Sequence, residues 1–185
     1  RRPGEYILMD LLLHCCCGPC ATGSLPQFQA QGYRPFCYFH NPNIQPWQEQ
    51  KARRESFIRL MESESLPYAI ADGYPLEDWL AAVAAAPADR CAYCYESRLR
   101  AAAEQAAERG YCRFSTTLLI SPYQKHEQIR QTGEKIAAAQ GLEFVYLDLR
   151  PGFRAGQQKA RERGLYMQKY CGCIYSEKER YLGNK

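Results

Sequence analysis

The segment that most constrains this chain is HCCCGPC, residues 14–20, where four cysteines crowd directly behind the apolar run 7–13. The chain has ten cysteines, and most of them fall into three tight groups, at 15–20, 91–94 and 171–173. Pairing all of them as disulfides would be typical of a small secreted domain with a weak core. Because this chain has 185 residues and is 46% hydrophobic, it can bury a core of its own. Clustered thiols in such a chain indicate metal binding or redox chemistry.

The net charge and the hydropathy of the chain further narrow the class of protein to which it belongs. A formal net charge of +4 allows a polyanion partner but is well short of a protein that coats DNA. No apolar stretch reaches the roughly 20 residues of a membrane span, and the run 7–13 lacks the cleavage site of a signal peptide. We expect one globular domain over 1–185, cytoplasmic and without a membrane partner. Its start at 1–5 should be frayed, and its C-terminal segment, 165–185, carries the third cysteine group.

Short apolar runs alternate with amphipathic stretches along the chain. The runs are rich in aromatic and branched residues, which predicts strands at 7–13, 36–39, 67–70, 111–116 and 144–149. The stretches between them predict helices at 48–64, at 95–109 with Gly110 as C-cap, and from an N-cap at Ser121 to Gly141. The alanine run 81–86 also indicates helix. This alternation predicts an α/β fold with a mostly parallel sheet flanked by helices.

Ligands of such sheets collect at the carboxyl ends of the strands, in the loops that lead into the next helix. Three polar loops hold that position: HCCCGPC, HNPNIQP at 40–46, and TTLLISPYQKHE at 116–127. We expect the three loops to share one crevice. Since none of them is a Gly-rich phosphate loop, we predict no ATP.

The first cysteine group predicts a sharp bend in the backbone. Adjacent side chains of a strand point to opposite faces, so Cys16 and Cys17 cannot both bind one small metal centre from an extended chain. Gly18 and Pro19 supply a bend into a helix whose N-terminal dipole favours thiolates. Cys20 then lies on the first helical turn.

The other two groups differ in spacing. Cys91 and Cys94 form a CxxC pair, which together with two thiols of the first group would complete a tetrahedral zinc site or a cubane iron–sulfur site. The spacing does not separate these two. Cys171 and Cys173 flank one glycine, and such a pair closes into a strained, easily reduced disulfide, which indicates a redox pair. One metal site needs only two of the three cysteine groups. The third group is then left over, which favours redox chemistry.

Isolated residues of the same types have plainer interpretations. Cys37 and Cys112 are interpreted as small buried hydrophobes and are left outside the site. His14 and His40 lie at strand ends, where a histidine is either a metal ligand or a hydrogen-bonded structural group.

Five motifs occur in an order and spacing that resemble a known family: LLLHCCCGPC, FHNPNIQP, RCAYCYESRL, STTLLISPYQKHEQI and YMQKYCGCIYS. They resemble the epoxyqueuosine reductases of the QueH family over residues 11–176. The resemblance implies reduction of the epoxide of epoxyqueuosine to queuosine, at the wobble position of tRNA with a GUN anticodon. This last step of queuosine synthesis would proceed without cobalamin and with an unidentified electron donor. The resemblance also implies the adenine-nucleotide-hydrolase-like (HUP) α/β sandwich of ATP-using tRNA thiolases.

The resemblance assigns roles to residues as well. The family pattern H-x-C-C-x-P-C leaves Cys15 outside the cluster. The implied ligands of a 4Fe-4S cluster are Cys16, Cys17, Cys91 and Cys94, and the implied redox-active pair is Cys171 and Cys173. A second metal beside the cluster, iron or another ion, is also implied. Its candidate ligands are Cys20, which we count with the catalytic residues, and Asp72.

The implied chemistry is consistent with these parts. Removing the epoxide oxygen takes two electrons and at least one proton, and an oxyanion forms as the C–O bond breaks. A cluster passes one electron at a time, so the dithiol of Cys171 and Cys173, or an adjacent iron, would supply the second. The candidate proton donors are Tyr123, His126 and Tyr170.

A tRNA partner is also consistent with the pattern of side chains. An anticodon loop offers unpaired bases for stacking and phosphates for cations. Aromatic and basic residues are interleaved in two places: Tyr38, His40 and Trp47 near Lys51, Arg53 and Arg54, and Tyr166 and Tyr170 near Arg161, Arg163 and Lys169. The alternative for each charge run is an ordinary solvated helix face.

Two other functions stay open on the residues alone. A zinc-stapled RNA-binding module would use the cysteines without catalysis, and a protein thiol oxidoreductase would use the CGC pair. The latter lacks the thioredoxin-like CxxC motif that opens a helix after the first strand. An anaerobic absorption spectrum separates iron–sulfur from zinc, because only the iron–sulfur cluster is coloured.

Overall fold

A computed structural model of the chain describes residues 8–183. Five parallel strands form one sheet in the order β3-β2-β1-β4-β5. The strands are β1 Met9–His14, β2 Tyr33–Phe39, β3 Tyr68–Ile70, β4 Arg113–Thr116 and β5 Glu143–Phe144. The predicted α/β fold with a parallel sheet is confirmed. The predicted frayed end at 1–5 and the first residue of the predicted strand 7–13 lie outside the described residues.

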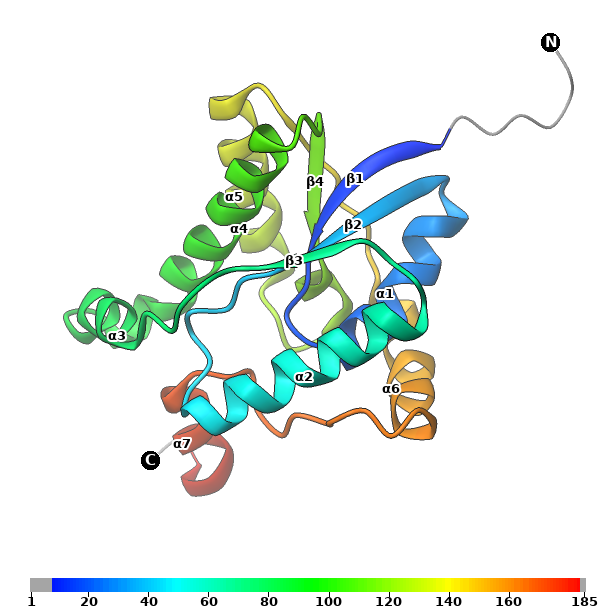
Figure 1. Ribbon diagram of the computed structural model, residues 1–185. Helices are drawn as coiled ribbons and strands as arrows, with labels where there is room; N and C mark the ends of the chain where they lie inside the picture. Colours follow the sequence, from blue (N-terminus) through cyan, green and yellow to red (C-terminus); the bar gives the residue numbers. More distant parts are fainter. Residues whose placement is uncertain (1–7, 184–185) are drawn as a thin grey trace, which may run out of the picture.

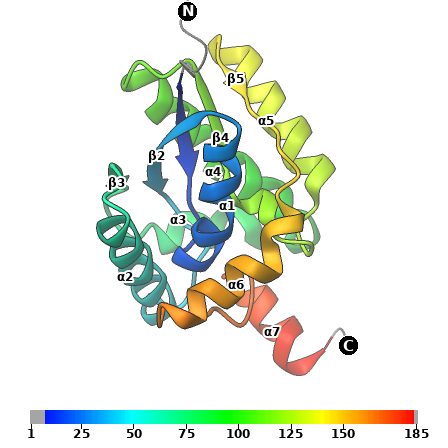
Figure 2. The same ribbon diagram turned by 90° about the vertical axis from the view of Figure 1, so that its right-hand side faces the viewer.

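Helices cover both faces of the sheet (Figures 1 and 2). One face carries α1 Gly18–Ala30, α2 Trp47–Ser63 and α6 Phe153–Glu162. The other carries α4 Arg90–Glu108 and α5 His126–Gln140, with α3 Leu76–Ala84 packed beside α4. The last helix is α7 Ile174–Leu182, and short 3-10 turns lie at η1 Pro87–Asp89, η2 Thr117–Ile120 and η3 Arg150–Gly152. No helix within 8–183 is long and apolar enough to cross a membrane.

The core explains why the central strand is apolar without alternation. Leu11, Leu12 and Leu13 of β1 are all fully buried, because helices cover the sheet on both sides. On α4, the buried positions include Leu99, Ala102, Ala103 and Ala106, at the spacing of one helix face. Small alanines let this helix lie close to the sheet. It ends as predicted, with Gly110 in the left-handed region at a φ of 75°.

Among the predicted boundaries that are wrong, two concern β5 and α5. The strand predicted at 144–149 is only Glu143–Phe144, an edge strand that pairs with β4 alone. Just beyond it, the Val145 carbonyl accepts from the Ser115 hydroxyl at 2.6 Å, a side-chain bond in place of a ladder bond. The helix predicted from an N-cap at Ser121 begins instead at His126. The Tyr95 hydroxyl donates to Gln124 Oε1 at 2.7 Å and accepts from the Lys125 amide at 3.2 Å. These bonds hold the segment before α5 against α4 as a turn, so the predicted first turn does not form.

Helices α1 and α6 cross at a glycine contact. A Cβ built on Gly156 would lie 2.5 Å from the Cα of Gly23, and one built on Gly23 would lie 3.1 Å from the Cα of Gly156. Only residues without a side chain allow this approach. The contact places α6 against α1, and the segment 163–173 then runs along the carboxyl ends of the strands.

Candidate active site

The site lies where the strand order reverses. From β1 the chain moves outward to β2 and β3 on one side, and it returns to β4 and β5 on the other, so the loops after β1 and β4 diverge. A hydrogen bond from the Cys16 amide to Thr117 Oγ1, 3.1 Å, joins these two loops at their start. The cysteine-rich turn is therefore at the switch point, which is the usual ligand position of such sheets.

The turn after β1 brings three sulfurs together. Cys17 is the N-cap of α1, and its sulfur accepts from the Cys20 amide at 3.4 Å. The ligand atoms of Cys16, Cys17 and Cys20 all lie within 4.8 Å of one another and are buried, so this group could hold a metal ion. The predicted bend and the predicted place of Cys20 in the first helical turn are confirmed.

The bend depends on Gly18 for a steric reason. A Cβ at this position would lie 2.6 Å from Ser56 Oγ and 2.7 Å from the Ser56 carbonyl oxygen of α2. A larger residue would push α2 away from the turn. Gly18 is therefore required by the close approach of another helix.

Interactions within the first cysteine group favour negative charge on one of its three sulfurs. Hydrogen bonds from Cys17 and then Cys20 hold the pKa of the Cys16 thiol well below its usual value. The pKa of Cys17 is raised by burial, and that of Cys20 by hydrogen bonding to Cys16 and Cys17. The Gln168 amide donates to Cys17 Sγ at 3.0 Å and to Cys20 Sγ at 3.6 Å. The group thus favours a thiolate at Cys16 beside thiols at Cys17 and Cys20.

The CxxC pair lies on the first turn of α4. This helix begins at Arg90, not at Tyr95 as predicted, so Cys91 and Cys94 are helical and share one face. They line a small cavity together with Cys171 and Cys173. The structure thus places the second and third cysteine groups, about 80 residues apart in sequence, side by side.

The surroundings of the CGC pair favour one thiol and one thiolate. Cys171 and Cys173 have their sulfurs 4.0 Å apart, and Cys173 is the N-cap of α7. Hydrogen bonding from Cys171, then from Ser176 and Arg90, lowers the pKa of Cys173 to about 5. The pKa of Cys171 is raised by its hydrogen bond to Cys173. The arrangement suits a thiolate beside a thiol, which is the reduced state of a redox pair.

A buried network anchors this pair. The Arg53 guanidinium donates to the carbonyls of Tyr170 and Cys171, both at 2.9 Å, and pairs with Glu49 at 2.7 Å. The Gln45 amide donates to the Gly172 carbonyl at 2.8 Å. Several polar groups of α2 and of the loop before it therefore fix the backbone of the CGC segment.

Gly172 is required twice in this segment. Its φ of 132° lies in a region that other residues rarely adopt. A Cβ there would lie 2.9 Å from Ile44 Cγ1 and 3.2 Å from Asn43 Nδ2. The glycine between the two thiols thus supplies conformation and space.

One large cleft joins the first and third cysteine groups. It has a volume of about 720 Å³ and is lined by Cys16, Cys20 and Cys171. Other lining residues come from the loop 116–127, from α6, from the segment 167–170 and from α7. Cys171 and Gln124 also line the smaller cavity that holds Cys91 and Cys94, so the two cavities adjoin.

Only two of the three predicted loops line this cleft. Among the described residues, none from the loop 40–46 does so. That loop lies behind the cleft, because Gln45 is bonded to the CGC segment and Asn43 lines the smaller cavity. The prediction of one shared crevice is wrong for this loop, whose role here is support.

The two histidines have structural partners. His14 is fully buried, donates from Nε2 to the His40 carbonyl at 2.9 Å and accepts from Thr116 Oγ1 at 2.8 Å. Burial lowers its pKa to about 3, so the ring is neutral and both nitrogens are engaged. The His40 ring stacks on Tyr38 at 6.1 Å between centroids. These contacts favour the structural interpretation for both.

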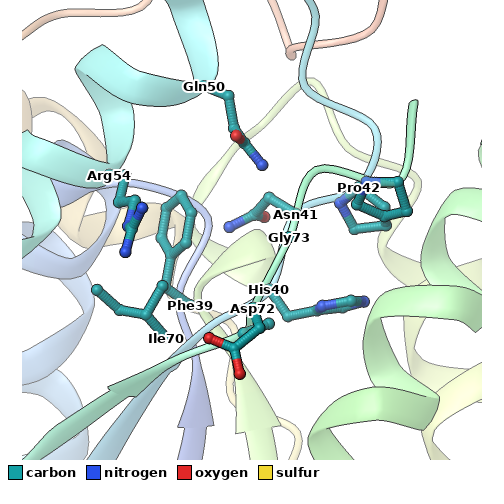
Figure 3. A pocket seen from close by; sticks show the side chains of 11 residues that line it. Phe39, His40, Asn41, Pro42, Gln50, Arg54, Ile70, Asp72 and Gly73 are labelled. Atoms are coloured by element: carbon teal, nitrogen blue, oxygen red, sulfur yellow. The ribbon is translucent and has the colours of Figure 1, made fainter. Parts of the chain in front are cut away.

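Asp72 is not with the cysteines. It lines a separate small pocket at the carboxyl ends of β2 and β3, together with Arg54, Gln50 and His40 (Figure 3). No cysteine of the described chain lines this pocket. The suggestion that Asp72 joins Cys20 as a metal ligand has no support in this arrangement.

The remaining predicted residues divide between the cleft and other roles. Tyr123, 84% exposed, and Tyr170 line the cleft, but the Tyr170 hydroxyl donates to the Gln45 carbonyl at 2.6 Å. The His126 ring contacts the Ser121 carbonyl at 3.0 Å. Arg53 is 2% exposed, so it is neither a phosphate contact nor part of a solvated face.

The isolated cysteines behave differently from each other. Cys37 is fully buried in the core, as predicted. Cys112 is exposed, so its interpretation as a buried hydrophobe is wrong. It lies just before β4, where the chain has left helix α4 and has not yet entered the sheet.

Two residues of the site were not singled out from the sequence. Arg98 follows Cys94 by one helical turn, and this spacing was the available signal. Gln168 lies three residues before Cys171, but nothing local connects its amide to the distant sulfurs of Cys17 and Cys20.

Comparisons with known proteins give the family. The family model described as epoxyqueuosine reductase QueH matches residues 11–179. Proteins named epoxyqueuosine reductase QueH are 37% identical in Dehalococcoides mccartyi (92% of this chain, 94% of that protein), 35% in Histophilus somni (90% and 71%) and 32% in Thermotoga maritima (92% and 91%).

A solved structure shows the same fold in a more distant protein. It is described as a predicted subunit of a tRNA methyltransferase from Methanocaldococcus jannaschii, and it is 14% identical with a TM-score of 0.56, over 84% of this chain and 75% of that one. This likeness concerns the fold alone. The family match spans all three cysteine groups and nearly the whole described chain. The chain therefore belongs to the QueH family of epoxyqueuosine reductases, which are oxidoreductases.

Proposed function

We propose that this protein reduces the epoxide of epoxyqueuosine to queuosine at the wobble position of a tRNA with a GUN anticodon, in the cytoplasm. It does so with a 4Fe-4S cluster and a redox-active CGC pair, and without cobalamin. The observation that carries the proposal is the cleft of about 720 Å³, since Cys16 and Cys20 of the group that could hold a metal ion and Cys171 of the CGC pair open onto it. Electron-carrying groups and a substrate-sized space therefore adjoin.

The donor set fits an iron–sulfur cluster. Soft thiolates select iron–sulfur clusters, zinc or copper(I) over harder ions. Cys16 lines the large cleft and has the sulfur of Cys17 3.7 Å from its own, while Cys91 and Cys94 line the adjoining cavity, so the two pairs belong to neighbouring spaces. We propose these four as the cluster ligands.

The close triad leaves one thiol beyond that set. Cys20 lies with Cys16 and Cys17 in the group that could hold one ion. Cys20 also lines the cleft, where the substrate oxygen would lie. We propose that Cys20 holds a second metal ion, iron or another, next to the cluster.

When bound, the cluster supplies single electrons at a potential set by its surroundings. The chain itself supplies a two-electron store. Oxidation of the thiols of Cys171 and Cys173 to a disulfide releases two electrons and two protons. The epoxide takes up both as its two C–O bonds break, a C=C bond forms and the oxygen leaves as water. A reductant of the dithiol or reduced-cofactor class then restores the thiols.

The cleft also holds groups that suit an RNA substrate. Lys169, Arg180 and the exposed ring of Tyr123 line it. Cations bind phosphates, and an exposed aromatic ring offers a face on which an unpaired base stacks. We propose that the anticodon loop enters from this side.

The test is turnover of tRNA that carries epoxyqueuosine. Protein purified without oxygen should contain iron and sulfide, should be brown, and should yield queuosine in digests analysed by mass spectrometry, with no cobalamin added. Cys91→Ala or Cys94→Ala should lose iron and colour together. Cys171→Ser and Cys173→Ser should keep the spectrum and lose most turnover, whereas Cys37→Ala, the buried control, should keep both.

Other outcomes would refute the proposal in parts. A colourless protein that contains zinc and binds RNA without turnover would favour the zinc-stapled module. If both serine variants lose the cluster, the CGC pair belongs to the metal site, and the electrons assigned to this pair must come from elsewhere, such as an adjacent iron. A turnover that needs cobalamin would exclude the proposed mechanism.

A further inference from the structure

Arg98 is a buried cation without an anionic side chain beside it. Its side chain is 3% exposed, and within residues 8–183 no carboxylate forms a salt bridge with it. Arg53 is equally buried, yet it pairs with Glu49 at 2.7 Å. A charge held away from water is strongly unfavourable unless an opposite charge compensates it. The protein must therefore supply an anion near Arg98 by other means.

The groups around Arg98 are neutral or are thiols. Its Nη2 donates to Asn41 Oδ1 at 2.6 Å, and its Nη1 contacts Cys94 Sγ at 3.6 Å. Its buried Nε has no hydrogen-bond partner among residues 8–183. Arg98 lines the small cavity together with Cys91, Cys94 and the CGC pair. The guanidinium thus faces the sulfur-lined space, with one donor still free.

The contact with Asn41 does not require a charge. The Asn41 amide donates in turn to the Cys15 carbonyl at 3.0 Å, so the chain of bonds ties α4 to the loop after β2 and to the cysteine turn. A neutral amide at position 98 could make the same bond. The hydrogen bond to Asn41 therefore does not explain why residue 98 carries a positive charge.

We infer that Arg98 is the counter-ion of the thiolate–metal centre and raises its reduction potential. The inference rests on the proposed function, because it needs a centre bound by these cysteines. A thiolate-bound iron–sulfur centre carries net negative charge, which grows when an electron is added. In a dry site a fixed positive charge stabilises the reduced form more than the oxidised form. Arg98 does not touch the substrate; it is a positioning residue that acts through the centre.

The experiment separates charge from hydrogen bonding. Arg98→Gln keeps an amide donor for Asn41 and removes the charge, and Arg98→Lys keeps the charge. Arg100→Gln is the matched control, since Arg100 is exposed on the same helix and pairs with Glu96. Iron, sulfide and the midpoint potential of the cluster are measured anaerobically for each protein.

The expected result is specific to the charge. Arg98→Gln should make one-electron reduction at least tenfold less favourable, which corresponds to a midpoint about 59 mV lower. Arg98→Lys should lie closer to the unmodified protein, and Arg100→Gln should match it. If Arg98→Gln retains too little iron to titrate, Arg98→Lys should retain more iron than Arg98→Gln.

Three outcomes would overturn the inference. They are an unchanged midpoint in Arg98→Gln, an equal shift in Arg100→Gln, and an equal loss of iron in the Gln and Lys variants. An unmodified protein that takes up no iron would refute the proposed function, and this inference with it. A normal cluster in the unmodified protein with an unaffected Arg98→Gln variant would refute the inference alone.

Discussion

The anchor of the CGC segment provides the most quantitative test of the structure. Arg53→Met removes a guanidinium that is 2% exposed and leaves Glu49, 8% exposed, without its cation. Breaking a buried ion pair on one side costs about 3–5 kcal/mol, because the remaining charge stays desolvated. The carbonyls of Tyr170 and Cys171 also lose charged donors at 2.9 Å. The loss of these two hydrogen bonds is not added to the cost of the broken ion pair, because water can reach part of the CGC segment and bond to the freed carbonyls.

We therefore expect Arg53→Met to lower the free energy of unfolding by about 3–5 kcal/mol. For a chain of 185 residues this corresponds to a fall in melting temperature of roughly 6–20 °C. The measurement is anaerobic urea denaturation of the isolated protein, followed by circular dichroism. Alkylation of Cys171 should also become faster, because its backbone is no longer held.

A double-mutant cycle with Glu49→Gln tests the cause. When both charges are removed, neither is left buried and unpaired, so the double variant should cost less than the sum of the single variants. The expected coupling is about 0.5–3 kcal/mol. A loss below about 1 kcal/mol in Arg53→Met, or additive single effects, would contradict the buried-pair reasoning.

Three further predictions concern other parts of the chain. Gly156→Ala should destabilise the protein by about 1–3 kcal/mol in thermal denaturation, because its Cβ would meet the backbone of Gly23 at 2.5 Å. Lowering the pH from about 6.5 to about 4 should reduce the free energy of unfolding through His40. Burial lowers the pKa of His40 in the folded protein to about 4, so the unfolded chain binds the proton more readily in this range. Denaturation measured at several pH values should show a weaker pH dependence in His40→Gln. Gln168→Leu should weaken metal retention about 10–100-fold in chelator competition, because the amide bond to Cys17 Sγ at 3.0 Å is lost.

Controls and contrary outcomes differ for each. Ala155→Ser, on the exposed side of α6, should be neutral, and equal losses at 155 and 156 would argue against a steric cause. An unchanged pH profile in His40→Gln would show that other groups carry the dependence. Gln158→Leu removes an exposed amide that donates to Glu162 at 3.0 Å, and it should leave metal retention intact. Equal metal retention in Gln168→Leu and Gln158→Leu would remove Gln168 from the site.

Local patterns were sufficient for the architecture and for the first cysteine turn. Alternating apolar runs and amphipathic stretches predict a parallel α/β sheet, because periodicity follows from how a helix or strand is buried. The Gly-Pro pair predicts the bend after β1 and the helical place of Cys20, because both depend on adjacent residues. The edge strand β5 and the start of α5 were mispredicted. Their bounds depend on contacts with β4 and on the hydroxyl of Tyr95, which are distant in sequence.

Only the tertiary structure decided which distant groups meet. It placed the CGC pair beside the CxxC pair, moved the loop 40–46 behind the cleft, and separated Asp72 from the cysteines. It also showed that Arg53 and Arg98, which look alike in sequence as helix cations, are both buried, one beside a carboxylate and the other facing sulfur. The physical reason is that spacing along the chain fixes which face of an element a residue occupies. Which groups that face contacts depends on how elements distant in sequence pack against it. The energetic cost of burying a charge depends on those contacts.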